Sequence, residues 1–189
     1  MACARLGRCC MHLLAAAVLL AGALPEARAA GATSATSTVK EWSAAQPAPI
    51  PLERLNGSPF DLKQLQGKVV VINLWAAWCA PCLTEMPALA RLARSVSGFP
   101  VEVLLVNTGD TPKAIERALA KAGAGLSTLR LAETAGPSWR MATLPATVIV
   151  DGSGRVRWLV SGAIDERGEP LRSLVLKLLP PAGTGRPQP

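Results

Sequence analysis

The strongest constraint on the fold of this 189-residue chain is an apolar, β-branched run that leads directly into two cysteines. Residues 68–76 read KVVVINLWA, and such a continuous run is typical of a strand that is buried on both faces. WCAPC occupies positions 78–82, and apolar side chains then recur every three or four positions from 81 to 96, which predicts a helix. The cysteines are therefore expected where a buried strand ends and a helix begins.

Strand and helix signals alternate through the rest of the chain. In order, we expect a hairpin within 50–62 with its turn at Asn56-Gly57, a strand over 101–107, a helix over 112–122, a short strand over 128–131, a hairpin over 147–161 and a final helix over 167–179. Strands that alternate with helices favour an α/β fold in which helices cover both faces of a sheet.

The start of a helix gives the cysteine pair its predicted chemistry. Free backbone N–H groups and the positive end of the helix dipole face Cys79, and both favour thiolate over thiol. Cys82 lies one turn further along the same helical face, where it can close a disulfide with Cys79, and Pro81 restricts the backbone between them. The predicted cycle is attack by Cys79 on a partner disulfide, followed by attack of Cys82 on the mixed disulfide.

Two other interpretations of this pair stay open. One is an inert structural disulfide, although structural bridges usually close longer loops. The other is half of a zinc site shared between two chains, because tetrahedral zinc takes four nitrogen or sulfur ligands and two cysteines supply only half of them.

The first residues are expected to direct export. Residues 1–29 resemble a secretory signal peptide, with arginines before an apolar run and Ala-Arg-Ala at the cleavage site; an uncleaved membrane anchor is the alternative. Residues 30–46 are expected to form a flexible leader and residues 180–189 a disordered tail. The folded domain is predicted over 47–179.

Removal of the signal peptide would narrow the possible chemistry. It takes away the single histidine, His12, and three of the five cysteines, which excludes histidine triads and histidine metal sites. We therefore expect no metal and no cofactor. The net charge of the whole chain is +7, but the basic residues are scattered, so no nucleic-acid partner is expected.

With these features, the sequence resembles the TlpA/ResA-like exported thiol–disulfide oxidoreductases of the thioredoxin superfamily. The resemblance covers about residues 47–179, and its motifs are the blocks at 48–62, 67–87 and 144–156. It implies a thioredoxin-like fold, with a central mixed sheet, helices on both faces and an N-terminal β-hairpin.

The same resemblance assigns roles to single residues. Cys79 would be the nucleophile and Cys82 the resolving cysteine. Pro145 would be the cis-proline that faces the disulfide and turns the backbone of Leu144 towards an extended substrate, and Trp78 would border the disulfide. An ordinary proline at the start of a strand is the alternative for Pro145.

Glu85 is the distinctive polar residue of the expected active-site helix. In the resembling group, a glutamate at this place lies near the cysteines and adjusts their protonation; a buried carboxylate could accept the Cys82 proton. A solvated helix carboxylate is the alternative. Thioredoxins proper carry a buried aspartate in the preceding strand, whereas this chain has Asn73, which cannot titrate.

The resemblance implies an exported reductase of protein disulfides that serves cytochrome c maturation or copper-site assembly. Its partners would be a protein disulfide and an upstream, membrane-bound reductant, and its place the periplasm, with membrane contact only if the N-terminal segment is uncleaved. Three alternatives remain: a disulfide-donating oxidant, a non-enzymatic copper-handling module of the same fold, and a peroxidase.

Overall fold

A computed structural model describes most of the predicted domain. The described residues are 37–43, 50–123, 125–136, 139, 143–165 and 167–180. The predicted signal peptide, most of the leader, and the tail from residue 181 onward lie outside them. Within the described residues, no helix is both long enough and apolar enough to span a membrane.

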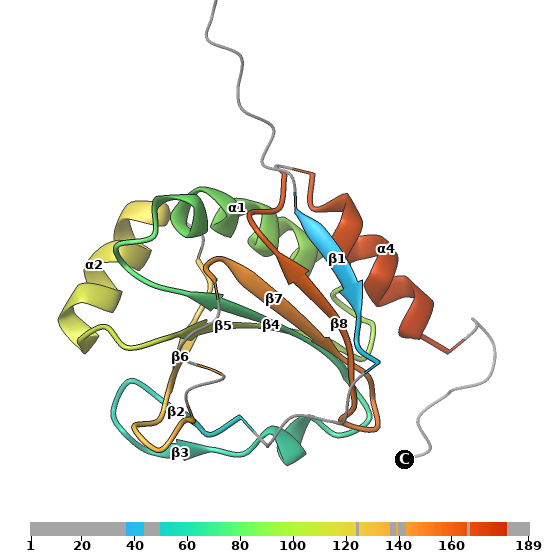
Figure 1. The fold of residues 1–189 in the computed structure, drawn as a ribbon, viewed down its shortest axis with the longest axis horizontal. Helices are drawn as coiled ribbons and strands as arrows, with labels where there is room; N and C mark the ends of the chain where they lie inside the picture. Colours follow the sequence, from blue (N-terminus) through green and yellow to red (C-terminus); the bar gives the residue numbers. More distant parts are fainter. Residues whose placement is uncertain are drawn as a thin grey trace, which may run out of the picture. The chain divides into compact units, whose positions relative to one another are not determined.

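The described residues form one mixed sheet and four helices (Figure 1). The strands are β1 (Thr38–Glu41), β2 (Leu52–Glu53), β3 (Pro59–Phe60), β4 (Val69–Trp75), β5 (Val101–Asn107), β6 (Thr128–Leu131), β7 (Ala146–Val150) and β8 (Val156–Ser161). The helices are the 3-10 helix η1 (Leu62–Leu65) and the α-helices α1 (Ala80–Ser95), α2 (Pro112–Ala122) and α4 (Glu169–Leu178). The predicted elements are confirmed, with ends that differ by one or two residues.

Strand β4 lies at the centre of the sheet. The strand order is β1-β8-β7-β4-β5-β6-β2-β3, in which β4 pairs parallel with β5 and antiparallel with β7. All seven residues of β4 are buried, as its apolar sequence predicts. Its last residues pair with Asn107 of β5 and Ala146 of β7, so the loop that follows β4 begins between the ends of two neighbouring strands.

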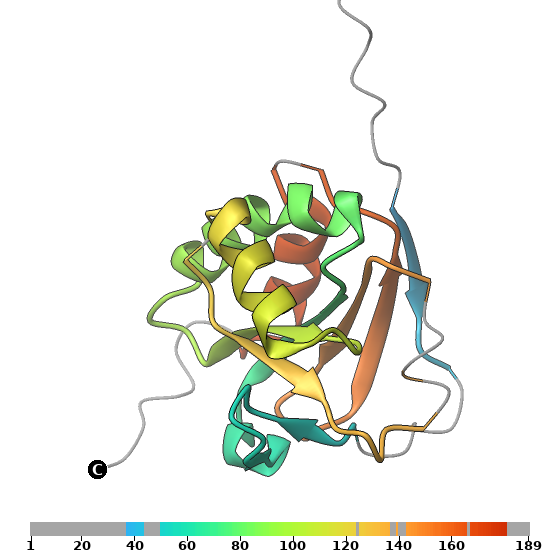
Figure 2. The same ribbon diagram turned by 90° about the vertical axis from the view of Figure 1, so that its left-hand side faces the viewer.

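Alternate residues of β4 point into two separate cores. Val69, Val71 and Trp75 pack in a cluster that includes the cysteines and residues of α1, α2 and α4. Val70 and Ile72 pack in a second cluster with residues of the β2–β3 hairpin and η1. Figures 1 and 2 show the three α-helices on one side of the sheet. Helices were expected on both faces of the sheet. Among the described helices, the three α-helices cover one face, and the short helix η1 packs on the other.

Strand β1 differs from the flexible leader expected over residues 30–46. Thr38 to Glu41 pair antiparallel with Ser161 to Trp158 at the edge of the sheet. All four residues of β1 are exposed, so the strand is held by backbone hydrogen bonds and leaves no alternating apolar pattern in the sequence. This part of the leader prediction is wrong for that reason.

Helix α4 offers a matched test of the core. Leu171 is fully buried, whereas Leu176 on the same helix is 40% exposed. Leu171→Ala should lower the free energy of unfolding by about 2–5 kcal/mol, because it leaves a cavity, and Leu176→Ala by about 0.5 kcal/mol. Urea unfolding of the two oxidised variants measures the difference, and equal losses would contradict this description of the core.

Candidate active site

The two cysteines form a disulfide at the first turn of α1. Cys79 is the N-cap residue, and its sulfur accepts a hydrogen bond from the backbone N–H of Cys82 at 3.3 Å. The bonded pair has a Cα–Cα distance of 5.3 Å. Cys79 is 4% exposed and Cys82 is fully buried, so Cys79 presents the sulfur that a partner can approach. The predicted strand–cysteine–helix arrangement is present.

The local sequence explains why the helix starts at this place. Pro81 lies in the first turn, where a missing N–H removes no helical hydrogen bond. The Cys79 carbonyl already accepts from the Leu83 N–H at 3.2 Å, which begins the helical ladder. The Cys82 N–H is one of the donors that a helix start leaves without a backbone partner, and the Cys79 sulfur receives it.

Two apolar residues that were predicted for the site, on different segments, keep exposed surface. Trp78 immediately precedes Cys79 and is 76% exposed, which is unusual for so large an apolar side chain. Leu144 is half-buried and packs against the core cluster that contains both cysteines. Both residues were predicted to belong to the site, and the structure gives each of them surface that a partner can contact.

The Leu144–Pro145 peptide bond is cis. Pro145 immediately precedes β7, whose first residue, Ala146, pairs with Leu74 near the end of β4. The Pro145 carbonyl accepts a hydrogen bond from the Gly162 N–H at 3.0 Å, which holds this turn against the end of β8. The turn is therefore fixed beside the strand that leads into the cysteines.

Glu85 is a buried carboxyl group one helical turn after Cys82, and the solvated alternative is wrong. It is 3% exposed. Its Oε1 accepts from Asn73 Nδ2 at 2.8 Å and its Oε2 from the Ile164 backbone N–H at 2.8 Å. Burial raises the pKa of Glu85 from 4.5 to about 7, and the hydrogen bonds from Ile164 and Asn73 oppose part of that rise.

Asn73 joins Glu85 to the neighbouring strand. Its side-chain amide also donates to Thr147 Oγ1 at 3.0 Å, while its own Oδ1 is buried and accepts no hydrogen bond. Asn73 and Thr147 face each other in the β4–β7 register. The sequence analysis did not identify Thr147 or Ile164, because their part in the site depends on strand pairing and on a loop far along the chain.

A third missed residue, Asp110, holds the loop that carries Trp78. Its Oδ2 accepts from the Ala77 backbone N–H at 2.6 Å and from Asn107 Nδ2 at 2.8 Å. The Asn107 side-chain oxygen in turn accepts from the Gly109 and Asp110 N–H groups. The Asn-Thr-Gly-Asp sequence that begins at the last residue of β5 is a turn signal that could have drawn attention to this segment.

Comparisons with known proteins show which family and which kind of activity this chain resembles. Residues 30–171 match the family model described as Redoxin. The chain is 35% identical to the thiol:disulfide interchange protein HelX of Rhodobacter capsulatus, over 58% of this chain and 61% of HelX. It is 29% identical to the thiol-disulfide oxidoreductase ResA of Bacillus subtilis, over 61% of this chain and 65% of ResA. The chain thus spans less than two thirds of each of these relatives.

Solved structures support the fold. A secreted disulfide oxidoreductase of Mycobacterium tuberculosis, described as homologous to Escherichia coli DsbE, is 26% identical with a TM-score of 0.56, over 68% of this chain and 95% of that one. A thiol:disulfide interchange protein DsbE from Chlorobium tepidum has a TM-score of 0.62 at 20% identity, over 71% and 96% of the two chains, and bears on the fold alone. The thioredoxin-like fold and the resemblance to ResA-like proteins are confirmed.

Glu85 should make stability depend on pH. Because its pKa is higher in the folded state, the folded protein binds more protons, and stability falls as pH rises from 4.5 to about 7. The fall should amount to about 3 kcal/mol. Glu85→Gln removes this contribution, and rotation of the Asn73 amide can present its oxygen to the new amide.

Urea unfolding of the oxidised proteins between pH 4.5 and 8 measures the effect. The wild-type free energy of unfolding should decline more steeply with pH than that of Glu85→Gln. The exposed Glu116→Gln is the matched control and should follow the wild type. Parallel pH profiles for wild type and Glu85→Gln would contradict the assignment.

Asp110 should control the opening of the loop before Cys79. Asp110→Ala removes the acceptor of the Ala77 N–H, and a hydrogen bond to a charged group contributes about 1.5 kcal/mol or more. Hydrogen exchange at Ala77 should therefore accelerate by about tenfold. The surface substitution Glu116→Ala should leave that amide unchanged, and unaltered exchange in Asp110→Ala would show that other contacts hold the loop.

Proposed function

Since this chain belongs to the Redoxin family, we propose that it is an exported thiol–disulfide oxidoreductase that reduces disulfides in other proteins through Cys79 and Cys82. The observation that carries the proposal is the Cys79–Cys82 disulfide at the start of α1, with the Cys82 N–H directed at the Cys79 sulfur. That N–H and the helix dipole stabilise negative charge on Cys79 when the bond is reduced.

The reduced protein begins the reaction with the Cys79 thiolate. This thiolate attacks one sulfur of a partner disulfide, a mixed disulfide forms, and the other partner sulfur leaves as a thiolate. Cys82 then loses its proton and attacks the Cys79 sulfur. The Cys79–Cys82 bond forms, the second partner sulfur leaves, and two electrons have passed to the partner. A dithiol reductant must return the protein to its reduced state.

Glu85 is the proposed acceptor of the Cys82 proton. The two residues are three positions apart on α1, which places both side chains on the same helical face. Both are buried, so a carboxylate is available there where bulk water is excluded. A group with a pKa of about 7 can take up and release a proton near neutral pH.

Leu144, Pro145 and Trp78 are proposed to receive the partner chain. An extended peptide can add backbone hydrogen bonds along the segment before β7, and Trp78 supplies exposed apolar surface next to Cys79. Pro145 fixes the direction of that segment, and its carbonyl is already occupied by Gly162. Because backbone hydrogen bonds do not depend on side chains, such a surface would accept partners of many different sequences.

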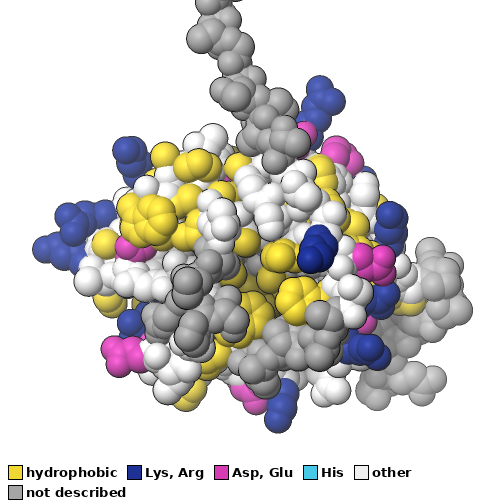
Figure 3. All heavy atoms as spheres, viewed as in Figure 1, with side chains coloured by type: hydrophobic (Ala, Val, Ile, Leu, Met, Phe, Trp, Pro, Cys, Tyr) yellow, Lys and Arg dark blue, Asp and Glu magenta, His cyan; other side chains and the backbone are white. Residues whose placement is uncertain are grey.

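The names of the relatives and the sequence of the N-terminus support a proposal for the biological setting. HelX and ResA are named as thiol–disulfide proteins, and residues 1–29 have the form of a signal peptide. These two observations support the proposal that the protein acts in the periplasm, receives electrons from a membrane-bound reductant and serves cytochrome c maturation or copper-site assembly. On the face drawn in Figure 3, most basic side chains lie around the edge of the molecule, with acidic and hydrophobic ones among them.

Trapping tests the roles of the two sulfurs. Cys82→Ser should accumulate mixed disulfides through Cys79 when the reduced variant meets a disulfide-containing protein, because no second thiol resolves them. Cys79→Ser should accumulate at least about tenfold fewer, since buried Cys82 is a poor target for a partner. Non-reducing electrophoresis followed by mass spectrometry measures the adducts.

Equal trapping by the two variants would overturn the assignment of nucleophile and resolving cysteine. Absence of adducts from both, with wild-type protein unable to reduce insulin disulfides, would overturn the proposed reductase function itself.

A further inference from the structure

The side-chain amide of Asn73 uses its two ends unequally. Its Nδ2 donates twice, to Glu85 Oε1 at 2.8 Å and to Thr147 Oγ1 at 3.0 Å. Its Oδ1 can accept two hydrogen bonds, yet this atom is buried and accepts none. A buried acceptor without a donor raises the free energy of folding. The unused oxygen of this amide therefore calls for an explanation.

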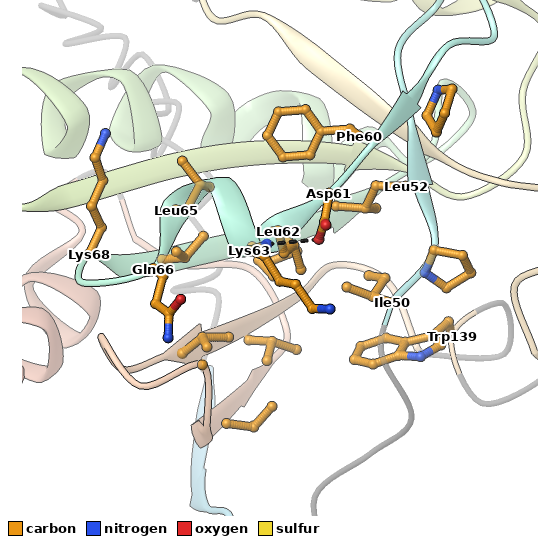
Figure 4. Close-up of a pocket in the computed structure, with 18 of the residues that line it drawn as sticks. Ile50, Leu52, Phe60, Asp61, Leu62, Lys63, Leu65, Gln66, Lys68 and Trp139 are labelled. Carbon is orange, nitrogen blue, oxygen red and sulfur yellow. Dashed lines mark hydrogen bonds between the residues drawn. The ribbon is translucent and has the colours of Figure 1, made fainter.

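The cavity drawn in Figure 4 does not supply one, because it lies on the other face of β4. Val70 and Ile72 line that cavity, and alternate residues of a strand point to opposite faces of the sheet. Asn73 points to the face covered by α1, where it reaches Glu85. The cavity therefore brings no solvent to the Asn73 amide, whose hydrogen bonds depend on the side chains around it.

Asn107, the other buried asparagine of the described residues, is held in one orientation. Its Nδ2 donates to Asp110 Oδ2 at 2.8 Å, and its Oδ1 accepts from the N–H groups of Gly109 and Asp110 at 3.0 and 2.8 Å. A half-turn of this amide would direct its nitrogen at backbone N–H groups, which cannot accept. Among the described residues, no N–H group bonds to Asn73 Oδ1 and locks it in this way.

Both partners of Asn73 can reverse their roles. The Thr147 hydroxyl accepts or donates according to the direction of its hydrogen. Glu85 accepts while it is charged, but the neutral acid carries a hydrogen that it donates. The second partner of Glu85, the Ile164 N–H at 2.8 Å from Oε2, is a donor in either case. Of these two partners, Asn73 is therefore the one that can accept the acid hydrogen.

Few charged or titratable groups surround this hydrogen-bonded set. On α1, Cys79 and Cys82 share a disulfide and do not titrate while it is intact. In the segment before α4, Asp165 is exposed, and its Oδ1 accepts from the Gly168 N–H at 2.8 Å. The buried residues of α4 are apolar. In the part of the chain that the structure describes, Glu85 is the one buried side chain that can carry a charge.

We propose that Asn73 is a positioning residue that holds Glu85 in both of its protonation states, by a half-turn of the Asn73 side-chain amide. With the carboxylate, Nδ2 faces Glu85 and Thr147, as in the structure. With the neutral acid, Oδ1 takes that place and accepts from Glu85 Oε1 and from the Thr147 hydroxyl. The terminal torsion of asparagine is broad and roughly two-fold, so both orientations are accessible. Each leaves one end of the amide unpaired, and the charge of Glu85 decides between them.

The half-turn gives Asn73 a part in disulfide reduction, and this part rests on the proposed function. When Cys82 passes its proton to the carboxylate, its S–H bond breaks and an O–H bond forms at Glu85 Oε1. The turned amide accepts that hydrogen, so the neutral acid keeps the position that the carboxylate had. Thr147 suits either orientation because a hydroxyl both accepts and donates.

Nuclear magnetic resonance of the oxidised full chain, with labelled asparagine amides, tests the half-turn between about pH 4.5 and 9. The Nδ2 protons of Asn73 should show a nuclear Overhauser contact to the Thr147 side chain at high pH. This contact should weaken several-fold at low pH, with a midpoint at the Glu85 pKa of about 7. Asn107 is the internal control and should keep its contacts throughout. A contact of Asn73 that persists at every pH would overturn the proposal.

Glu85→Gln should fix the turned orientation at every pH. The Ile164 N–H still directs the glutamine oxygen towards itself, so the glutamine N–H groups face Asn73 and need its oxygen. The Asn73 contact to Thr147 should therefore be weak throughout the pH range. A strong contact in this variant, like that of the wild type at high pH, would contradict the half-turn.

Thr147→Val and Thr147→Ser separate positioning from packing. Valine has the shape of threonine but removes the acceptor that Nδ2 needs beside the carboxylate, whereas the turned amide still accepts the acid hydrogen. Thr147→Val should thus favour neutral Glu85 by about tenfold and raise its ionisation midpoint by about one pH unit. Thr147→Ser keeps the hydroxyl and should follow the wild type. Circular dichroism verifies folding, and equal midpoints in the two folded variants would refute the proposal.

Reduction of insulin by the reduced variants tests the part in catalysis. Turnover by Thr147→Val should be slower than that by Thr147→Ser near neutral pH and approach it at high pH, where Glu85 is charged in both. Identical pH profiles would refute this part. Because the resonance experiments use oxidised protein, their failure would leave the proposed reductase function standing. Wild-type protein that cannot reduce insulin would overturn that function, and with it the part of Asn73 in catalysis.

Discussion

The hydrogen bond from Asn73 to Glu85 connects the central strand to the helix that carries the disulfide. Asn73 lies within β4, Glu85 within α1, and the same network reaches β7 through Thr147 and the segment before α4 through Ile164. A polar group in a core raises the free energy of folding unless it has hydrogen-bond partners. Four segments must therefore assemble in register before Glu85 can be buried at acceptable cost.

The surroundings of Glu85 have opposite effects on its charged and neutral forms. Both Glu85 oxygens accept hydrogen bonds, which favours the charged carboxylate, yet burial has the larger effect and favours the neutral acid. An apolar residue at this position would remove the desolvation cost and also the titratable group. Ionisation of this buried carboxyl group therefore lowers the stability of the fold near neutral pH.

Different parts of the molecule were predictable from the sequence to different degrees. Strand β4 and helix α1 were predicted well because their buried residues give the sequence a continuous apolar run in the strand and a regular spacing of apolar residues in the helix. Strand β1 was not, because all its residues are exposed and its pairing uses backbone groups. Thr147 and Asp110 were missed for a related reason: each contributes one side-chain oxygen to a residue distant in sequence, and no local pattern encodes that contact.

The asparagine at position 73 simplifies the acid–base behaviour of the site. Asn73, Thr147 and the Ile164 N–H do not change their protonation state near neutral pH, so Glu85 is the titratable group of this hydrogen-bonded set. Two buried carboxyl groups in contact would share their protonation steps, and neither pKa would belong to one residue. Here the oxidised protein has a single buried carboxyl group in the network, and coupling begins only when reduction creates thiols at Cys79 and Cys82. In the proposed mechanism, proton uptake by Glu85 is thereby tied to the redox state of the cysteine pair.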